Sequence, residues 1–172
     1  MPLSGQAFAL SFKKGRLMIK LAFYKDTKSI WSKLICAWTG VFNQNVGSYS
    51  HCEIGFFLQG RWVWYSSASR NSDGSTGTRW IEDEDLFSHP DRWDVFDVKP
   101  IRSIEDMVHT CEEECGKKYD WLGIFGFATI FGQINAKKKW YCSEICNYVF
   151  FGKWKKRISP KGLFKKIKPY IV

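Results

Sequence analysis

Residues 50–67 read SHCEIGFFL-QG-RWVWYSS, and this stretch decides how the sheet of the protein is built. Its two runs, Ser50–Leu58 and Arg61–Ser67, are rich in the aromatic and β-branched residues that strands prefer. Gln59-Gly60 separates them, and a two-residue loop with glycine is the usual connection of an antiparallel hairpin. The sequence therefore predicts a β-hairpin that turns at Gly60.

The register of this hairpin follows from the position of its turn. With Gln59-Gly60 as the loop, Ser66 lies opposite Glu53, and Ala68 lies opposite His51. Alternate residues of a strand project to the same face, so the side chains of His51 and Glu53 are expected to be neighbours.

Further strands and helices surround the hairpin. No internal repeat occurs, and strands mixed with separate helices predict an α+β fold in which an antiparallel sheet packs against helices. Hydrophobic periodicity gives the individual elements. The expected strands are Arg16–Tyr24 and Asp91–Val98, the expected loop is Ser69–Thr78, and the expected helices are Ser29–Trp38, one between Ser103 and Gly116, one around Gly123 and Gly126, and Cys142–Phe150.

The helix between Ser103 and Gly116 has clear limits. Ser103 caps it, with Asp106 three residues on as the acidic partner, and Gly116 ends it. Its 3.6-residue period places Cys111 and Cys115 on the apolar face, so we expect both thiols in the core.

The cysteines do not form a disulfide framework. Six stand at positions 36, 52, 111, 115, 142 and 146, without a Cys-x-x-Cys pair. His109 precedes Cys111 by two residues, and a His/Cys metal site is an alternative that core packing of these thiols makes unnecessary. We expect reduced thiols, no metal and no cofactor.

Basic charge is concentrated at the C-terminus. Residues 1–136 contain 15 Lys/Arg and 16 Asp/Glu, whereas residues 137–172 contain 11 Lys/Arg and one acid, Glu144. Such a cluster attracts anionic partners, for example nucleic acid, anionic lipid or an acidic protein. A solvated basic face is the commoner use of such a charge run, and we favour it.

Length and composition indicate one domain. The chain has 172 residues, 45% of them apolar, which predicts a single domain over residues 1–160 and a basic C-terminal tail, residues 161–172, packed on the body or on a partner. No stretch has the roughly 20 consecutive apolar residues of a membrane-spanning helix, and the N-terminal residues do not resemble a secretory signal. We expect cytoplasmic synthesis and no transmembrane segment, and we leave the oligomeric state open.

Cys142 opens the last expected helix, a position that suits a reactive thiol. Unpaired N–H groups and the positive end of the helix dipole stabilise a thiolate there. A thiol nucleophile needs a base, and His51 is the strand histidine, with an imidazole that titrates near neutrality. Glu53 or Ser66 would orient the ring. Taken one by one, such residues are more often structural.

Four motifs occur in order along the chain: Tyr49–Glu53 (YSHCE), Tyr65–Arg70 (YSSASR), Lys118–Gly123 (KYDWLG) and Trp140–Glu144 (WYCSE). Together they resemble the circularly permuted papain-like enzymes, the YiiX-like branch of the NlpC superfamily, many of them encoded by bacteria and their phages. The resemblance runs from about residue 17 to residue 160. It implies a permuted papain-like fold in which the histidine strand precedes the cysteine helix.

The resemblance also implies roles for individual residues. Cys142 would be the nucleophile, His51 the general base, and Glu53 or Ser66 the third member of a triad. Relatives often carry a carboxylate or amide on the strand after the histidine, where this chain has serines. A serine orients an imidazole less strongly, so Glu53 is preferred. Tyr119 matches the Tyr-Asp motif and would line the site.

The implied function is a cysteine hydrolase, a peptidase or amidase, that acts on peptide amide bonds of the bacterial cell wall, and the basic C-terminus would suit an anionic wall polymer. One alternative is lipid acyl transfer or thioesterase action by the same Cys and His chemistry, as in the lecithin:retinol acyltransferase relatives. Another is a non-catalytic binding or virion-structural protein that keeps the fold and binds nucleic acid or partner subunits through its tail. A phage protein of this kind would be carried in the virion or released at lysis.

Overall fold

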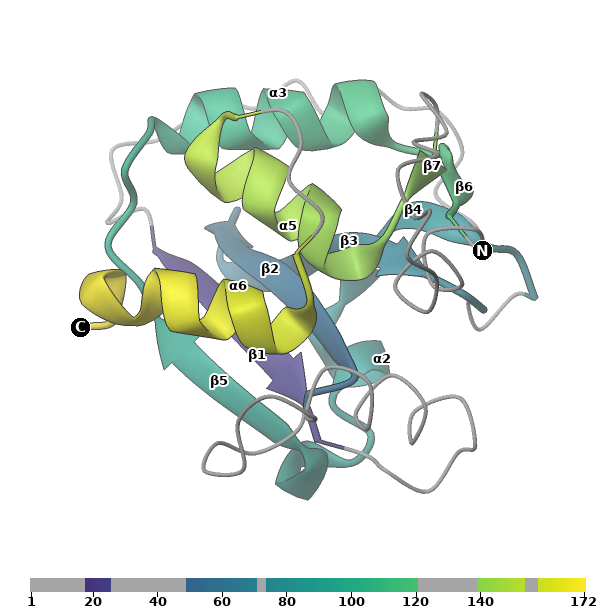
Figure 1. Cartoon of the computed structure of the whole chain (residues 1–172), viewed down its shortest axis with the longest axis horizontal. Coiled ribbons are helices and arrows are strands. Elements are labelled where there is room, and N and C mark those ends of the chain that lie inside the picture. Colours follow the sequence, from purple (N-terminus) through teal and green to yellow (C-terminus); the bar gives the residue numbers. More distant parts are fainter. Residues whose placement is uncertain (1–17, 26–48, 71–73, 121–138, 154–157) are drawn as a thin grey trace, which may run out of the picture.

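The computed structural model describes residues 18–25, 49–70, 74–120, 139–153 and 158–172. The predicted helices Ser29–Trp38 and around Gly123 and Gly126 lie outside these residues. Within the described part, the chain is an α+β protein in which helices pack on an antiparallel sheet, as predicted (Figure 1). Among the helices described, none has the length and hydropathy needed to cross a membrane.

Five antiparallel strands form the main sheet, in the order β4-β3-β2-β1-β5. A second, two-stranded parallel sheet pairs β6 with β7. The strands are β1 (Ile19–Tyr24), β2 (His51–Leu58), β3 (Arg61–Ala68), β4 (Gly77–Glu82), β5 (Trp93–Asp97), β6 (Lys118–Tyr119) and β7 (Lys139–Trp140). The helices are α2 (Asp83–Leu86), α3 (Ile104–Glu114), α5 (Cys142–Phe151) and α6 (Pro160–Ile167), with the 3₁₀ turns η1 (Pro90–Arg92) and η2 (Lys168–Tyr170).

β2 and β3 form the predicted hairpin, with its turn at Gln59-Gly60. The φ angles of these two residues are 51° and 83°, left-handed at both positions, as a type I′ hairpin turn requires. The strands expected in Arg16–Tyr24 and Asp91–Val98 also form, as β1 and β5.

The hydrogen-bond ladder between β2 and β3 ends before the strands do. It runs from Leu58–Arg61 to Ile54–Tyr65 in the predicted register, but the predicted pairs of Ser66 with Glu53 and of Ala68 with His51 do not form. Beyond this point β2 continues to His51 along β1, and β3 continues to Ala68 along β4. The sheet therefore opens at this end between β5-β1-β2 on one side and β3-β4 on the other (Figure 1).

β4 was not among the predicted elements. We expected a loop up to Thr78, but Gly77 and Thr78 already pair with β3. Glycine and hydroxyl residues favour a loop locally, and hydrogen bonding to a neighbouring strand overrides that preference. On its other side, β4 bonds to the segment after α3: the Thr78 N–H donates to the Lys117 carbonyl (2.9 Å), and the Gly116 N–H donates to the Thr78 carbonyl (3.0 Å).

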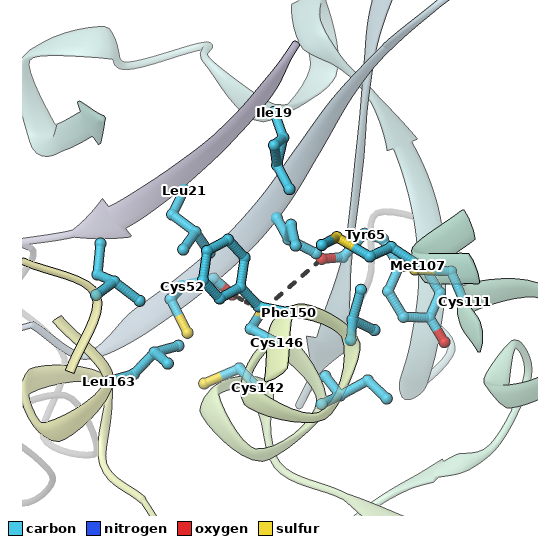
Figure 2. Packing of buried hydrophobic residues seen from close by; sticks show 14 of the residues in the cluster. Ile19, Leu21, Cys52, Tyr65, Met107, Cys111, Cys142, Cys146, Phe150 and Leu163 are labelled. Carbon is cyan, nitrogen blue, oxygen red and sulfur yellow. Dashed lines mark hydrogen bonds between the residues drawn. The ribbon is translucent and has the colours of Figure 1, made fainter. Parts of the chain in front are cut away.

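α5 packs on one face of the sheet, with α3 and α6 on either side of it (Figure 1). Its buried stripe is the one the sequence predicts, and every member has an exposed fraction of 0%: Cys142, Ile145, Cys146 and Val149. Figure 2 shows Cys142 and Cys146 among sheet residues of the same core cluster, Leu21, Cys52 and Tyr65.

α3 begins as predicted, because the Ser103 hydroxyl accepts a hydrogen bond from the Asp106 N–H at 3.1 Å. Cys111 is buried as predicted, but the prediction for Cys115 was wrong, since this thiol is exposed. The helix ends at Glu114, and Cys115 has an extended backbone with ψ of 141°. The helical period therefore no longer sets the direction of its side chain.

The basic C-terminal segment forms an amphipathic helix, α6. Its first residues are capped by Ser159, whose hydroxyl accepts from the Gly162 N–H at 3.1 Å. The exposed side of the helix carries Lys165 and Lys166. Its apolar side belongs to the main core cluster, through Leu163, Phe164 and Ile167.

The end of the chain lies along β5. Ile171 forms an isolated antiparallel bridge with Val98, and the Val172 N–H donates to the Asp97 carbonyl at 3.1 Å. The segment of residues 161–172 thus packs on the body of the protein.

The contribution of α6 to the core can be measured. Leu163 has an exposed fraction of 0%, and we expect Leu163→Ala to lower the free energy of unfolding by about 2–5 kcal/mol, because a cavity remains. Lys165→Ala, at an exposed position of the same helix, should stay within about 0.5 kcal/mol of the wild type. Urea denaturation followed by tryptophan fluorescence measures both values. Equal losses in the two variants would mean that α6 is not part of the core.

Candidate active site

The chain that leads into α5 is fixed at Trp140. The Trp140 carbonyl accepts a hydrogen bond from the Ser67 hydroxyl at 2.8 Å and another from the Asp120 N–H at 3.1 Å. β6 and β7 pair at Tyr119 and Trp140. α5 therefore begins, at Cys142, beside the opened end of β3.

Cys142 occupies the first turn of α5, as predicted. The Tyr141 carbonyl accepts the first helical bonds, from the N–H groups of Glu144 and Ile145, each at 3.1 Å. The N–H groups of Cys142 and Ser143 come before these bonds, and together with the helix dipole they place partial positive charge at the start of the helix.

Three groups lower the pKa of Cys142: the thiol and the main chain of Cys52, and the imidazole of His51. Burial raises the pKa of Cys142, but the hydrogen bond from the Cys52 thiol and the charge and hydrogen bond of His51 outweigh burial. The pKa of Cys142 therefore lies well below its ordinary value. This environment favours the thiolate.

His51 lies between Cys142 and Glu53. Its Nε2 is 2.7 Å from Oε1 of Glu53, which leaves the other ring nitrogen for Cys142. Burial lowers the pKa of His51, but the charge and hydrogen bond of Cys142, followed by those of Glu53, raise this pKa to about 10. Cys142 and His51 therefore form a thiolate–imidazolium pair at neutral pH. The His51 side chain is 22% exposed and Cys142 is 0% exposed, so solvent meets the pair at the histidine.

Glu53 is fully buried and is held by Arg79 as well as by His51. The Arg79 guanidinium donates two hydrogen bonds, at 3.0 and 2.7 Å, one to each carboxylate oxygen. Burial raises the pKa of Glu53, but the charge of Arg79 and the hydrogen bond from His51 lower it below its ordinary value. The two parallel bonds fix the plane of the carboxylate, and the carboxylate in turn orients the imidazole.

Ser66, the other predicted orienting residue, binds the main chain of β2. Its hydroxyl donates to the Cys52 carbonyl at 2.7 Å and accepts from the Cys146 thiol at 3.8 Å. The Ser66 hydroxyl thus supplies a hydrogen bond to β2 where the ladder between β2 and β3 has ended, while Glu53 contacts the imidazole. The structure brings together Cys142, His51 and Glu53 of the predicted residues.

Tyr119, the predicted lining residue, is buried close to the thiolate. Its ring packs against that of Tyr141, with centroids 6.0 Å apart. Burial and then the charge of Cys142 raise the pKa of Tyr119.

Sequence reasoning missed two residues of this site, Arg79 and Cys52. Arg79 belongs to β4, which was not predicted, and the signal was the strand-like run Thr78–Glu82 directly after the loop. Cys52 stands next to His51, and this adjacency was its signal. Strand alternation predicts that the two side chains project to opposite faces of β2, and it therefore offers no reason to expect both of them beside Cys142. They both act on Cys142 at the end of β2 that lies beyond the ladder with β3.

The alternative metal site does not assemble on α3. His109 is exposed and lies 3.4 Å from Glu113, whereas Cys111 is buried in the core. In the part of the chain that the structure describes, no three His, Cys, Asp or Glu residues are grouped to hold a metal ion.

Comparison with known proteins identifies no family. No family model matches the chain, and no curated protein and no solved structure matches it. The function is therefore argued from the geometry of the site and from the motifs in the sequence.

The ion pair can be tested through the pH profile of Cys142 alkylation by iodoacetamide, read by peptide mass spectrometry. In the wild type, the rate should stay near its plateau down to about pH 6, because the pKa of the thiol is lowered. His51→Ala should slow alkylation at that pH by at least about tenfold, whereas His89→Ala, an exposed histidine, should change nothing. Cys115 is an exposed residue whose partial burial raises the pKa of its thiol, so it should react only at alkaline pH in every variant. Identical profiles for wild type and His51→Ala would contradict the ion pair.

The interaction of Arg79 with Glu53 can be tested through the pH dependence of the free energy of unfolding. Arg79→Met leaves a buried carboxylate without its guanidinium and should lower the free energy of unfolding at neutral pH by about 3–5 kcal/mol. A lowered folded-state pKa stabilises the protein above the unfolded pKa, and this stabilisation disappears as pH falls through the folded value. The deficit should therefore shrink as the pH falls below about 4.

The matched control is Arg61→Met, since Arg61 makes an exposed pair with Glu82 at 2.6 Å. This pair should contribute less than about 1 kcal/mol. Urea denaturation at both pH values compares the variants. A loss for Arg79→Met that does not depend on pH would mean that the side chain acts through packing and not through the Glu53 charge.

Proposed function

We propose that the protein is a cysteine hydrolase in which Cys142 attacks a carbonyl carbon and His51 carries the proton. One observation supports this above all others: a single imidazole lies between the Cys142 thiolate and the buried Glu53 carboxylate, whose distance from Nε2 is 2.7 Å. A nucleophile, a base and a group that orients the base are the parts this chemistry needs. The permuted papain-like fold implied by the motifs belongs to the same proposal.

The reaction would proceed in two halves. The Cys142 thiolate attacks the carbonyl carbon, and the oxygen takes up negative charge in a tetrahedral intermediate. The N–H groups at the start of α5, including that of Cys142, are placed to stabilise this oxyanion. His51 gives its proton to the leaving amine, which departs and leaves an acyl-thioester on Cys142. Neutral His51 then takes a proton from water, the hydroxide attacks the thioester, and the acid product leaves with the thiolate restored.

Glu53 acts through His51. Its lowered pKa keeps it charged, so that it stabilises the imidazolium before the attack and holds the ring in one orientation afterwards. Arg79 is a further positioning residue, since its two bonds leave the carboxylate little freedom to turn away.

The substrate proposal is an amide bond in a cell-wall peptide, and it rests on the resemblance of the motifs to the NlpC superfamily. The same thiol and imidazole would accept an acyl ester or thioester, so the test includes both substrate classes.

A second candidate is a non-catalytic protein that keeps the fold, and one observation favours it. Cys142 has an exposed fraction of 0%, whereas a substrate carbonyl must reach the sulfur. Catalysis requires approach from the side of His51, the more exposed member of the pair.

The test measures turnover of purified peptidoglycan stem peptides and, in parallel, of acyl thioesters. We expect amide cleavage, with kcat/KM lowered at least about 10³-fold in Cys142→Ser and in His51→Ala. Cys115→Ser, which changes the exposed cysteine outside the site, should match the wild type. Turnover of thioesters alone would reassign the activity to thioesterase or lipid acyl-transfer chemistry. Turnover of neither class, or full activity in Cys142→Ser, would overturn the hydrolase and favour the non-catalytic protein.

A further inference from the structure

Cys52 helps to lower the pKa of Cys142 but makes and breaks no bond in the proposed hydrolysis. Its thiol lies near enough to the Cys142 sulfur for the two groups to shift each other's pKa, that of Cys142 downward and that of Cys52 upward. Figure 2 shows the two sulfur atoms turned toward one another between β2 and the start of α5.

We propose that Cys52 and Cys142 form a reversible disulfide when the protein meets hydrogen peroxide, which makes this pair an oxidative switch on the site. The disulfide itself follows from the placement of the two thiols. Only its consequence, the loss of hydrolysis, rests on the proposed function.

The first step oxidises Cys142. Its thiolate attacks one peroxide oxygen, the O–O bond breaks, and the departing hydroxide takes the proton of the His51 imidazolium to become water. The product is a sulfenic acid at Cys142 and a neutral His51. A thiolate next to a proton donor is the form of cysteine that reacts in this way.

The second step resolves the sulfenic acid. The Cys52 sulfur attacks the Cys142 sulfur, hydroxide leaves, and it combines with the proton of the Cys52 thiol to form a second water. Two thiols thereby supply the two electrons that reduce one peroxide. A dithiol reductant reverses the process by thiol–disulfide exchange.

Placement explains why Cys52 is the resolving thiol. Cys52 and Cys142 are both 0% exposed, so a large external thiol has poor access to a sulfenic acid that the small peroxide molecule can form. A resolving thiol that already lies beside the sulfenic acid does not have to diffuse to it, which is the advantage of an intramolecular reaction.

Cys146 is the competing partner, and its contacts make it the weaker one. Its thiol lies 3.7 Å from the Cys52 carbonyl and 4.0 Å from the Tyr65 carbonyl, so it is directed at the main chain of the opened ladder (Figure 2). The thiol of Cys52 interacts with both sulfurs, and its hydrogen bond with the sulfur that is oxidised, Cys142, raises its pKa more than its hydrogen bond with Cys146 does.

The experiment treats the full chain with hydrogen peroxide, blocks free thiols with N-ethylmaleimide under denaturing conditions, and maps tryptic peptides by mass spectrometry without reduction. Trypsin leaves Cys52 on Leu34–Arg61 and Cys142 on Trp140–Lys153. We expect these two peptides to become linked, and dithiothreitol to separate them. Fragmentation, repeated in Cys36→Ser, identifies the linked cysteines, because Cys36 and Cys146 share the two peptides.

Two serine variants form a matched pair. Cys52→Ser should abolish the link and give sulfinic acid at Cys142, while Cys146→Ser should form the link as the wild type does. Near-ultraviolet circular dichroism checks that both variants are folded. Absence of a link in folded wild type, or a link through Cys146, would overturn the proposal.

The readout also separates this proposal from the hydrolase. A link that forms in a protein without turnover would support the switch and leave the hydrolase unsupported. Turnover that survives peroxide without a link would do the reverse. If both hold, peroxide should lower turnover at least tenfold, and dithiothreitol should restore it, in wild type and Cys146→Ser but not in Cys52→Ser.

Discussion

The position of the candidate site depends on the early end of the ladder between β2 and β3. Buried main-chain carbonyls need hydrogen-bond partners, and where the strands part they lose the ones a sheet would supply. The Ser66 hydroxyl and the Cys146 thiol satisfy the Cys52 carbonyl, and the Ser67 hydroxyl bonds to Trp140 ahead of α5. Side chains of one strand and one helix thus complete the sheet, which fixes α5 against it and brings Cys142 to the opening.

The charges at the opening alternate from Cys142 through His51 and Glu53 to Arg79. Each would be costly to bury alone, because burial opposes the charged form of every one of them. Their mutual attraction in a poorly solvated site outweighs that cost, so the charged forms persist together. The four side chains therefore behave as one unit, and the lowered pKa of the thiol depends on the unit and not on Cys142 by itself.

Local patterns in the sequence were sufficient for the hairpin, for the start of α5 and for the Ser103 cap, because turn chemistry, helix period and capping are properties of neighbouring residues. The pairing of His51 with Glu53 also followed from strand alternation. Arg79 could not be placed, since its contact depends on a strand that long-range pairing, and not local preference, creates. The predicted burial of Cys115 was wrong for a different reason: the helical period that predicted it stops one residue earlier, at Glu114.

Both outer edges of the main sheet are bonded at one end by the protein's own chain. At the end of β5, Ile171 bridges Val98 and the Val172 N–H donates to the Asp97 carbonyl; beside β4, Gly116 and Lys117 bond to Thr78. An uncovered edge strand offers free N–H and C=O groups to any extended chain, and proteins that leave one open risk association edge to edge. These contacts shorten the stretch of each edge that another extended chain could pair with, which lowers the risk of fibre-like assembly.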